Sequence, residues 1–127
     1  MKQELDELIG QLNGSLGSVD WVPIVYQYQS IPFAELVALY SVADVALITP
    51  LRDGMNLVAK EYVACRIHDD GALVLSEFAG AADELKQAFL VNPYDIDGMK
   101  AALLQACRSQ PRELNRRMRA MRRTVRE

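Results

Sequence analysis

The hydrophobic period of this chain changes within one short stretch, and that change limits what the chain can fold into. Residues 45–49 form an apolar run of β-favouring residues. From Leu57 to Cys65 the apolar residues recur at helical spacing instead. The stretch from Asp44 to Arg66 (DVALITPLRDGMNLVAKEYVACR) therefore predicts a strand, a tight loop and a helix.

The loop of this unit, residues 50–56, indicates a site at the edge of a sheet. It contains Pro, Asp-Gly and Asn, which favour turns, and Asn56 can cap a helix that begins at Leu57. A parallel strand followed by a helix places unpaired backbone N–H groups, and the positive end of the helix dipole, at the carboxyl edge of the sheet. Such an edge favours a bound phosphate.

Two acidic side chains bracket the loop: Asp53 lies in the turn, and Glu61 lies about one turn into the helix. Phosphates accept hydrogen bonds from N–H groups, whereas sugar hydroxyls donate to carboxylates. The arrangement therefore suits a ligand that carries both phosphates and sugar hydroxyls. The alternative is an ordinary surface turn at Asp53-Gly54 and a solvated Glu61. The spacing alone does not distinguish a ligand site from an ordinary surface turn.

Three longer motifs carry a resemblance. The run RDGMNLVAKEYVACR, with SEFAGAADEL and LVNPYDIDGM downstream, resembles the C-terminal domain of trehalose-6-phosphate synthases, from about Trp21 to about Ala106. These are retaining glycosyltransferases of the GT-B type, with two Rossmann-like domains facing a cleft. The resemblance implies an α/β fold, a three-layer Rossmann-like domain with a short parallel sheet that forms most of the C-terminal half of a GT-B glycosyltransferase.

The resemblance also implies roles for individual residues in binding a nucleotide-sugar donor, usually UDP-glucose. Asp53 bonds hydroxyls of the donor glucose, and Glu61 takes the ribose hydroxyls. Val58 and Leu36 lie beside the base. The residues whose backbone groups contact the sugar and diphosphate are Gly54, Met55, Asn56 and Leu57. Asp53 and Glu61 also stand where related transferases carry the acidic pair of an E-x7-E pattern, with Asp as the first member here. No cofactor and no metal are implied.

The implied reaction transfers glucose from UDP-glucose, or another nucleotide diphosphate glucose, to glucose 6-phosphate with retention. At 127 residues the chain has room for one domain. We therefore expect a fragment that lacks the N-terminal acceptor domain and is inactive alone, with the phosphate-clamping Arg and Lys upstream of Met1. Glucosylglycerol-phosphate synthases and pseudo-glycosyltransferases share much of the signature. A non-catalytic binding or assembly module is the alternative from another class.

The composition excludes several classes of protein and of site. Half of the residues are apolar, about a quarter are charged, and the net charge is −3. No apolar run approaches a membrane span or a signal-peptide core, so we expect a cytoplasmic protein without membrane contact. Cys65 and Cys107 form no metal-type pair and are expected to be reduced thiols. His68 stands beside two aspartates in a polar turn and is expected to be solvated.

The flanking sequence predicts further elements. Residues 2–12 should form a helix that Asn13-Gly14 and Gly17 end, residues 22–28 a strand, and the segment after Pro32 a helix buried on most sides. Residues 45–49 should be an interior strand with helices on both faces. Downstream we expect strands at 72–75 and 88–91, a short helix at 81–86, a helix capped by Asp95 that runs to about Arg108, and a final helix opened by Pro111.

The end of the chain, residues 109–127, is the most basic part. It holds seven arginines and two glutamates, a charge of +5, so the remainder carries −8. An apolar stripe recurs at helical spacing, and no aromatic residue is interleaved for base stacking. The stripe consists of Leu114, Met118, Met121 and Val125. We therefore expect an amphipathic helix with a solvated basic face, not a nucleic-acid site. A poorly covered stripe and a bare sheet edge would favour a homodimer or larger assembly.

Overall fold

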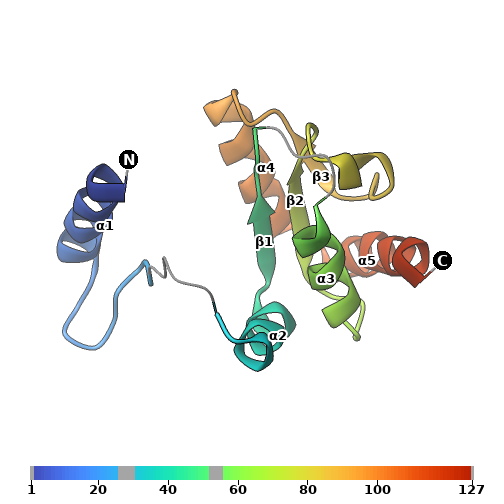
Figure 1. Ribbon diagram of the computed structural model, residues 1–127, viewed down its shortest axis with the longest axis horizontal. Helices are drawn as coiled ribbons and strands as arrows, with labels where there is room; N and C mark the ends of the chain where they lie inside the picture. The colour runs from blue at the N-terminus through green and yellow to red at the C-terminus, as the bar shows by residue number, and fades with distance from the viewer. Residues whose placement is uncertain (1, 26–30, 52–55, 127) are drawn as a thin grey trace. The chain divides into compact units, whose positions relative to one another are not determined.

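The computed structural model describes residues 2–25, 31–51 and 56–126. The chain divides into two compact units, Met1–Pro32 and Phe33–Glu127. The first unit consists of helix α1 (Lys2–Leu16) and the segment that follows it. The second unit carries the sheet and the remaining helices (Figure 1).

Helix α1 does not end where the sequence predicted. It continues through Asn13 and Gly14 to Leu16, and the N–H of Gly17 donates to the Asn13 carbonyl (2.9 Å). The Asn13 side chain bonds the N–H and the carbonyl of Ile24 at 2.9 and 2.8 Å. The side chain of Asn13 is therefore committed to the following segment. The helix ends beside Gly17, and the chain turns between Ser18 and Trp21.

The strand expected at residues 22–28 is wrong for residues 22–25, and residues 26–28 lie outside the described part of the chain. Ser18 and Trp21 form a short antiparallel bridge, and no ladder follows. Both backbone groups of Ile24 bond to Asn13, so they cannot take part in a strand ladder. The apolar composition of this segment predicted a strand, but a side-chain hydrogen bond replaced the pairing.

The second unit is a three-layer α/β domain, as the sequence predicted. The elements in chain order are α2 (Phe33–Val42), β1 (Val45–Ile48), α3 (Leu57–Cys65), β2 (Ala72–Ser76), the 3₁₀ turn η1 (Gly80–Asp83), β3 (Phe89–Val91), α4 (Ile96–Arg108) and α5 (Pro111–Arg126). The three strands are parallel and lie in the order β1-β2-β3. The segment expected as a helix at 81–86 is the shorter η1 instead.

The central strand separates two cores. Leu73 and Leu75 of β2 pack with α3 and α5, whereas Ala72 and Val74 point to the opposite face and pack with α4. This alternation follows from the two-residue period of a strand. All five residues of β2 are buried, which is the pattern of a parallel strand covered on both faces.

Two predictions of burial are wrong. β1 was expected in the interior, but among the described strands it pairs only with β2, and Leu47 is 47% exposed. α2 was expected to be buried on most sides, but it has no buried residue, and Phe33 is 78% exposed. An apolar run shows how hydrophobic a segment is. It does not show which neighbours are present to cover it.

The apolar stripe of α5 is covered, contrary to the prediction. Met118 and Met121 are 0% and 1% exposed, and they pack in one cluster with α3 and β2. Val125 joins that cluster, and Leu114 packs on the other one. The stripe therefore gives no reason for association, and the expected homo-oligomer stays a prediction.

Other elements match their sequence signals. Asp95 caps α4 by accepting from the Gly98 N–H (3.0 Å), and α4 ends at Arg108. Cys65 and Cys107 are free thiols, and His68 is exposed. Among the described residues, no helix is both long enough and apolar enough to cross a membrane.

Candidate functional site

The carboxyl edge of the sheet carries the capped N-terminus of α3. The Asn56 side chain accepts from the Ala59 N–H at 2.9 Å, which confirms the predicted cap. Asn56 is only 8% exposed, so packing holds the cap in place. The N–H groups of Leu57 and Val58 have no acceptor within the helix, as in the first turn of any α-helix. A helix N-terminus of this kind favours a bound anion.

The three predicted site residues of α3 lie on its exposed side. Leu57 is 63% exposed and Val58 is 45% exposed, although both are apolar. Glu61 is exposed as well, one turn further along the helix. The residues that α3 turns toward the core are Ala59, Tyr62 and Val63. The helix therefore presents two apolar side chains and one carboxylate to solvent beside its own N-terminus.

Helix α2 supplies a partner for Glu61. The Tyr40 hydroxyl donates to the Glu61 carboxylate at 3.3 Å. Burial, followed by the charge and the hydrogen bond of Glu61, raises the pKa of Tyr40. The phenol therefore remains a donor at neutral pH. Leu36 lies one helical turn before Tyr40, so both occupy the same face of α2. Leu36 is half-buried there.

A buried arginine that was not predicted from the sequence fixes α2 against α3. Arg66 is 3% exposed and donates to the carbonyls of Tyr40 (3.1 Å) and Ser41 (2.6 Å), the last turn of α2. It also donates to the Asp70 carbonyl and pairs with the Asp70 carboxylate (3.0 Å). Tyr62 adds a bond to the Ala43 carbonyl (2.7 Å). These contacts hold the helix that carries Tyr40.

The spacing of the buried residues of α3 is a sequence pattern that indicates this contact. Ala59, Tyr62, Val63 and Arg66 recur at three- and four-residue intervals, which is the spacing of a single helix face. A charged residue on the buried face needs hydrogen-bond partners. Free carbonyls at a helix C-terminus are such partners.

A second loop, which follows β2, lies at the same edge of the sheet. The Ser76 hydroxyl accepts from the Phe78 N–H (3.1 Å), and the Glu77 N–H donates to the Val91 carbonyl (2.8 Å). Phe78 packs edge-on against Tyr94, with ring centroids 6.0 Å apart. The loop follows β2 as the Asn56 loop follows β1. No ligand contact is predicted for this loop.

Three of the predicted site residues, Asp53, Gly54 and Met55, lie outside the described residues. The described cavities lie elsewhere. One of about 650 Å³ lies along α5, one of about 400 Å³ lies at the start of β1 and just before β2, and one of about 150 Å³ lies between Asp69 and the last turns of α5. Within the described ranges, no group of three or more His, Cys, Asp or Glu side chains could hold a metal ion. The expected absence of a metal and of a cofactor stays a prediction.

A parallel sheet between helical layers, with a strand, a loop and a capped helix at its carboxyl edge, defines the class of Rossmann-like domains. The chain belongs to glycosyltransferase family 20, because the model of that family matches residues 1–127. It is 54% identical over 125 residues to trehalose-6-phosphate synthase of Mycolicibacterium smegmatis, a match that covers 98% of this chain and 25% of the relative. It is 52% identical over 126 residues to the bifunctional trehalose-6-phosphate synthase/phosphatase of Thermoproteus tenax, covering 99% of this chain and 17% of that protein.

Solved structures agree with the sequence relatives. The α,α-trehalose-phosphate synthase (UDP-forming) of Burkholderia xenovorans, in complex with glucose 6-phosphate, superposes with a TM-score of 0.91 at 46% identity. The Escherichia coli structure described as bound with UDP-2-fluoro glucose has a TM-score of 0.90 at 44% identity. Each match covers 98% of this chain and 28% of the solved chain. The chain thus spans between 17% and 28% of the length of these relatives. The GT-B resemblance and the fold prediction are confirmed.

Proposed function

We propose that this chain is the donor-binding part of an α,α-trehalose-phosphate synthase, which transfers glucose from UDP-glucose to glucose 6-phosphate with retention. The observation that carries the proposal is the exposed face of α3, where Leu57, Val58 and Glu61 stand next to a capped helix N-terminus. The family of the chain supports the reaction class. The reaction is proposed for the cytoplasm and uses no metal and no cofactor.

The residues of α3 suit the parts of a nucleotide sugar. The free N–H groups of the first turn would donate to the diphosphate, and the Glu61 carboxylate would accept from the ribose hydroxyls. Val58 and Leu36 would lie against the base, while Asp53 and the backbone of Gly54 and Met55 would bind the glucose. The chemical contribution is electrostatic: N–H dipoles fixed at the helix N-terminus stabilise the charge that develops on the departing diphosphate.

The Tyr40 hydrogen bond gives Glu61 a defined place before the donor arrives. A carboxylate that accepts from a phenol keeps a second oxygen for another donor, because each carboxylate offers two acceptor oxygens. The hydroxyl holds Oε2 at 3.3 Å. The ribose hydroxyls would then meet a carboxylate that has already lost part of its rotational freedom, which lowers the entropic cost of binding.

Replacing Glu61 with alanine should weaken binding of UDP by about 1–3 kcal/mol, because two ribose hydroxyls lose their acceptor. Isothermal calorimetry with UDP measures the change. Glu7→Ala is the matched control, since it removes an exposed glutamate from α1 and should leave the affinity unchanged. Equal UDP affinities for the parent chain and Glu61→Ala would contradict a nucleotide site on α3.

The 127-residue chain alone should transfer no glucose. Transfer needs the acceptor held beside the donor, and the positioning of two substrates supplies a large part of the rate. The chain spans about a quarter of its relatives, and the proposed residues all serve the donor. Incubation with UDP-glucose and glucose 6-phosphate, followed by measurement of released UDP against a heat-inactivated sample, checks this. Turnover above that control would show that the chain also binds the acceptor.

A further inference from the structure

Helix α5 carries seven arginines, and two of them are part of the fold. The Arg117 guanidinium lies 4.2 Å from the ring centroid of Phe89 and donates to the Gln87 carbonyl at 2.9 Å. Arg122 pairs with Asp69 at 2.8 Å. Both side chains are mostly buried by these contacts. Their positions need no ligand.

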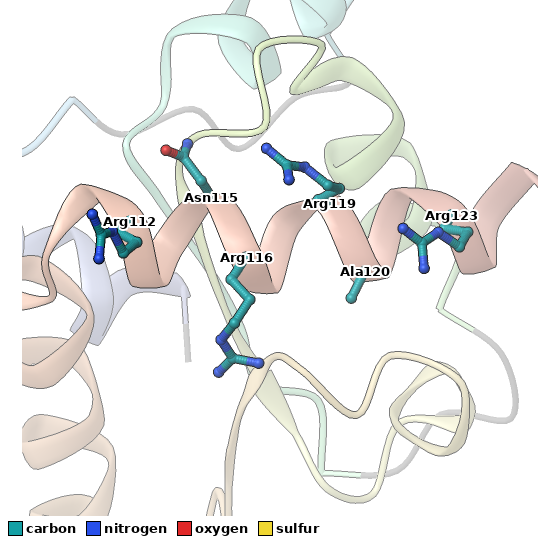
Figure 2. A pocket seen from close by; sticks show the side chains of 6 residues that line it. All are labelled: Arg112, Asn115, Arg116, Arg119, Ala120 and Arg123. Atoms are coloured by element: carbon teal, nitrogen blue, oxygen red, sulfur yellow. The ribbon is translucent and has the colours of Figure 1, made fainter.

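Four other arginines line the outer side of the same helix around a shallow cavity of about 650 Å³. These are Arg112, Arg116, Arg119 and Arg123, with Asn115 and Ala120 completing the lining. Figure 2 shows that Asn115 and Arg119 extend to one side of the helix and Arg116 and Ala120 to the other, with Arg112 and Arg123 at the two ends. The small Ala120 side chain leaves room between long cationic ones. We call this surface the arginine face.

The charge of the arginine face is only partly balanced within the chain. Arg116 shares the Glu113 carboxylate with Arg117, and their three hydrogen bonds to it lower the pKa of Glu113. Arg119 is 3.7 Å from Asp69, which already holds Arg122. Arg112 and Arg123 have no ion pair and no hydrogen bond with any described residue. Unbalanced positive charge therefore stands at both ends of the cavity.

The charges of the same unit indicate which kind of partner the arginine face can bind. Residues 33–108 carry a net charge of −5, which would repel a large polyanion or an anionic membrane beyond the edge of the helix. α5 has no aromatic side chain for base stacking. Its Met118 and Met121 are buried in the core, so they cannot enter a lipid surface. A narrow acidic protein segment that stays along α5 avoids most of this repulsion and needs neither aromatic stacking nor membrane insertion.

The spacing of the arginines indicates the shape of that segment. The four positions follow the pattern i, i+4, i+7 and i+11, which spans about 16 Å along an α-helix. The pair i, i+4 recurs seven residues later, a rise of about 10 Å. An acidic helix with carboxylates at the same intervals places one carboxylate beside each guanidinium. Arginine binds carboxylates through two parallel N–H donors, which favours such a register.

We propose that the arginine face of α5 is a docking surface for an acidic α-helical segment of a partner protein, which lies along α5 and pairs with Arg112, Arg116, Arg119 and Arg123. This interaction is separate from the proposed donor site on α3. It depends on ionic strength, because exposed charges are screened over about 8–10 Å at physiological salt.

The test uses the full 127-residue chain and a fluorescein-labelled, alanine-based peptide with glutamates at i, i+4, i+7 and i+11. Fluorescence anisotropy at low salt should show binding that weakens as salt is added. Arg112→Glu/Arg123→Glu should raise the Kd at least tenfold. Lys100→Glu/Arg108→Glu is the matched control, since it changes the net charge equally on exposed positions of α4 and should change the Kd less than twofold. Circular dichroism checks that both variants fold.

Several results would overturn the proposal. Equal losses in the two double variants would mean that only the overall charge matters. Equal binding of a peptide with the same composition but scrambled glutamates would remove the register argument. Tighter binding of a DNA duplex or of phosphatidylserine vesicles than of the peptide would assign the surface to another partner class, and absence of any binding would leave it a solvated face.

Discussion

Replacing Gly71 with alanine should destabilise the sheet-containing unit by roughly 2–6 kcal/mol, the combined cost of backbone strain and overpacking. Gly71 has φ +84°, a conformation that residues with a side chain rarely adopt. A Cβ atom there would meet the Tyr62 hydroxyl at 2.5 Å and Arg66 Nε at 2.8 Å. Both atoms are hydrogen-bonded to backbone carbonyls, so neither can move without losing a bond.

Urea denaturation followed by circular dichroism measures this effect. Gly10→Ala is the matched control, since a Cβ at Gly10 meets no atom within 4 Å. It lies within α1, where alanine is favoured over glycine by up to about 1 kcal/mol. The double variant Gly71→Ala/Tyr62→Phe removes the nearest clash and should recover part of the loss. A Gly71→Ala midpoint within experimental error of the parent would show that the backbone at this position relaxes freely.

Arg66→Met should have the second large effect, about 2–4 kcal/mol of unfolding free energy. Methionine fills much of the same volume, but it leaves the Tyr40 and Ser41 carbonyls at the end of α2 without their donor. Asp70 is 56% exposed in its side chain and regains water, so most of the loss comes from the carbonyls. Arg66→Lys keeps the charge but not the planar guanidinium group. It should lose less unfolding free energy than Arg66→Met.

Hydrogen exchange distinguishes the role of Arg66 from a general loss of stability. In Arg66→Met the amides of α2 should exchange faster by a larger factor than those of α4, because the missing contacts belong to α2. Arg108→Met, at the exposed end of α4, is the control and should change neither helix much. UDP affinity should also fall in Arg66→Met, since α2 carries Tyr40. A uniform increase of exchange over α2 and α4 would contradict a local clamp.

The sequence predicted the parts of the fold that depend on local chemistry. Asn56 and Asp95 cap their helices as expected, because a cap needs only a side chain and the N–H groups two or three residues later. The strand β2 was predicted from its apolar run, and the change of period before Leu57 located β1, the loop and α3. Family resemblance then supplied the roles that spacing alone left open.

The sequence did not predict the features that depend on contacts between residues distant in sequence. The strand expected around Ile24 was lost to the side chain of Asn13, eleven residues earlier. Arg66 reaches carbonyls 25 and 26 residues away, a contact that no local pattern specifies. Within the candidate site, the sequence predicted Glu61 as a binding residue but gave no role to Tyr40, because the pairing of α2 with α3 is a tertiary contact.

The two buried methionines of α5 affect the order in which the chain becomes native during synthesis. Met118 and Met121 complete the cluster behind α3, yet they are translated more than fifty residues after it. Such contacts between distant residues form late, after the cost of closing a long loop has been met. Until α5 has left the ribosome, Tyr62 and Leu75 lack part of their apolar cover. A newly made chain therefore exposes part of this cluster to chaperones and proteases until α5 has emerged.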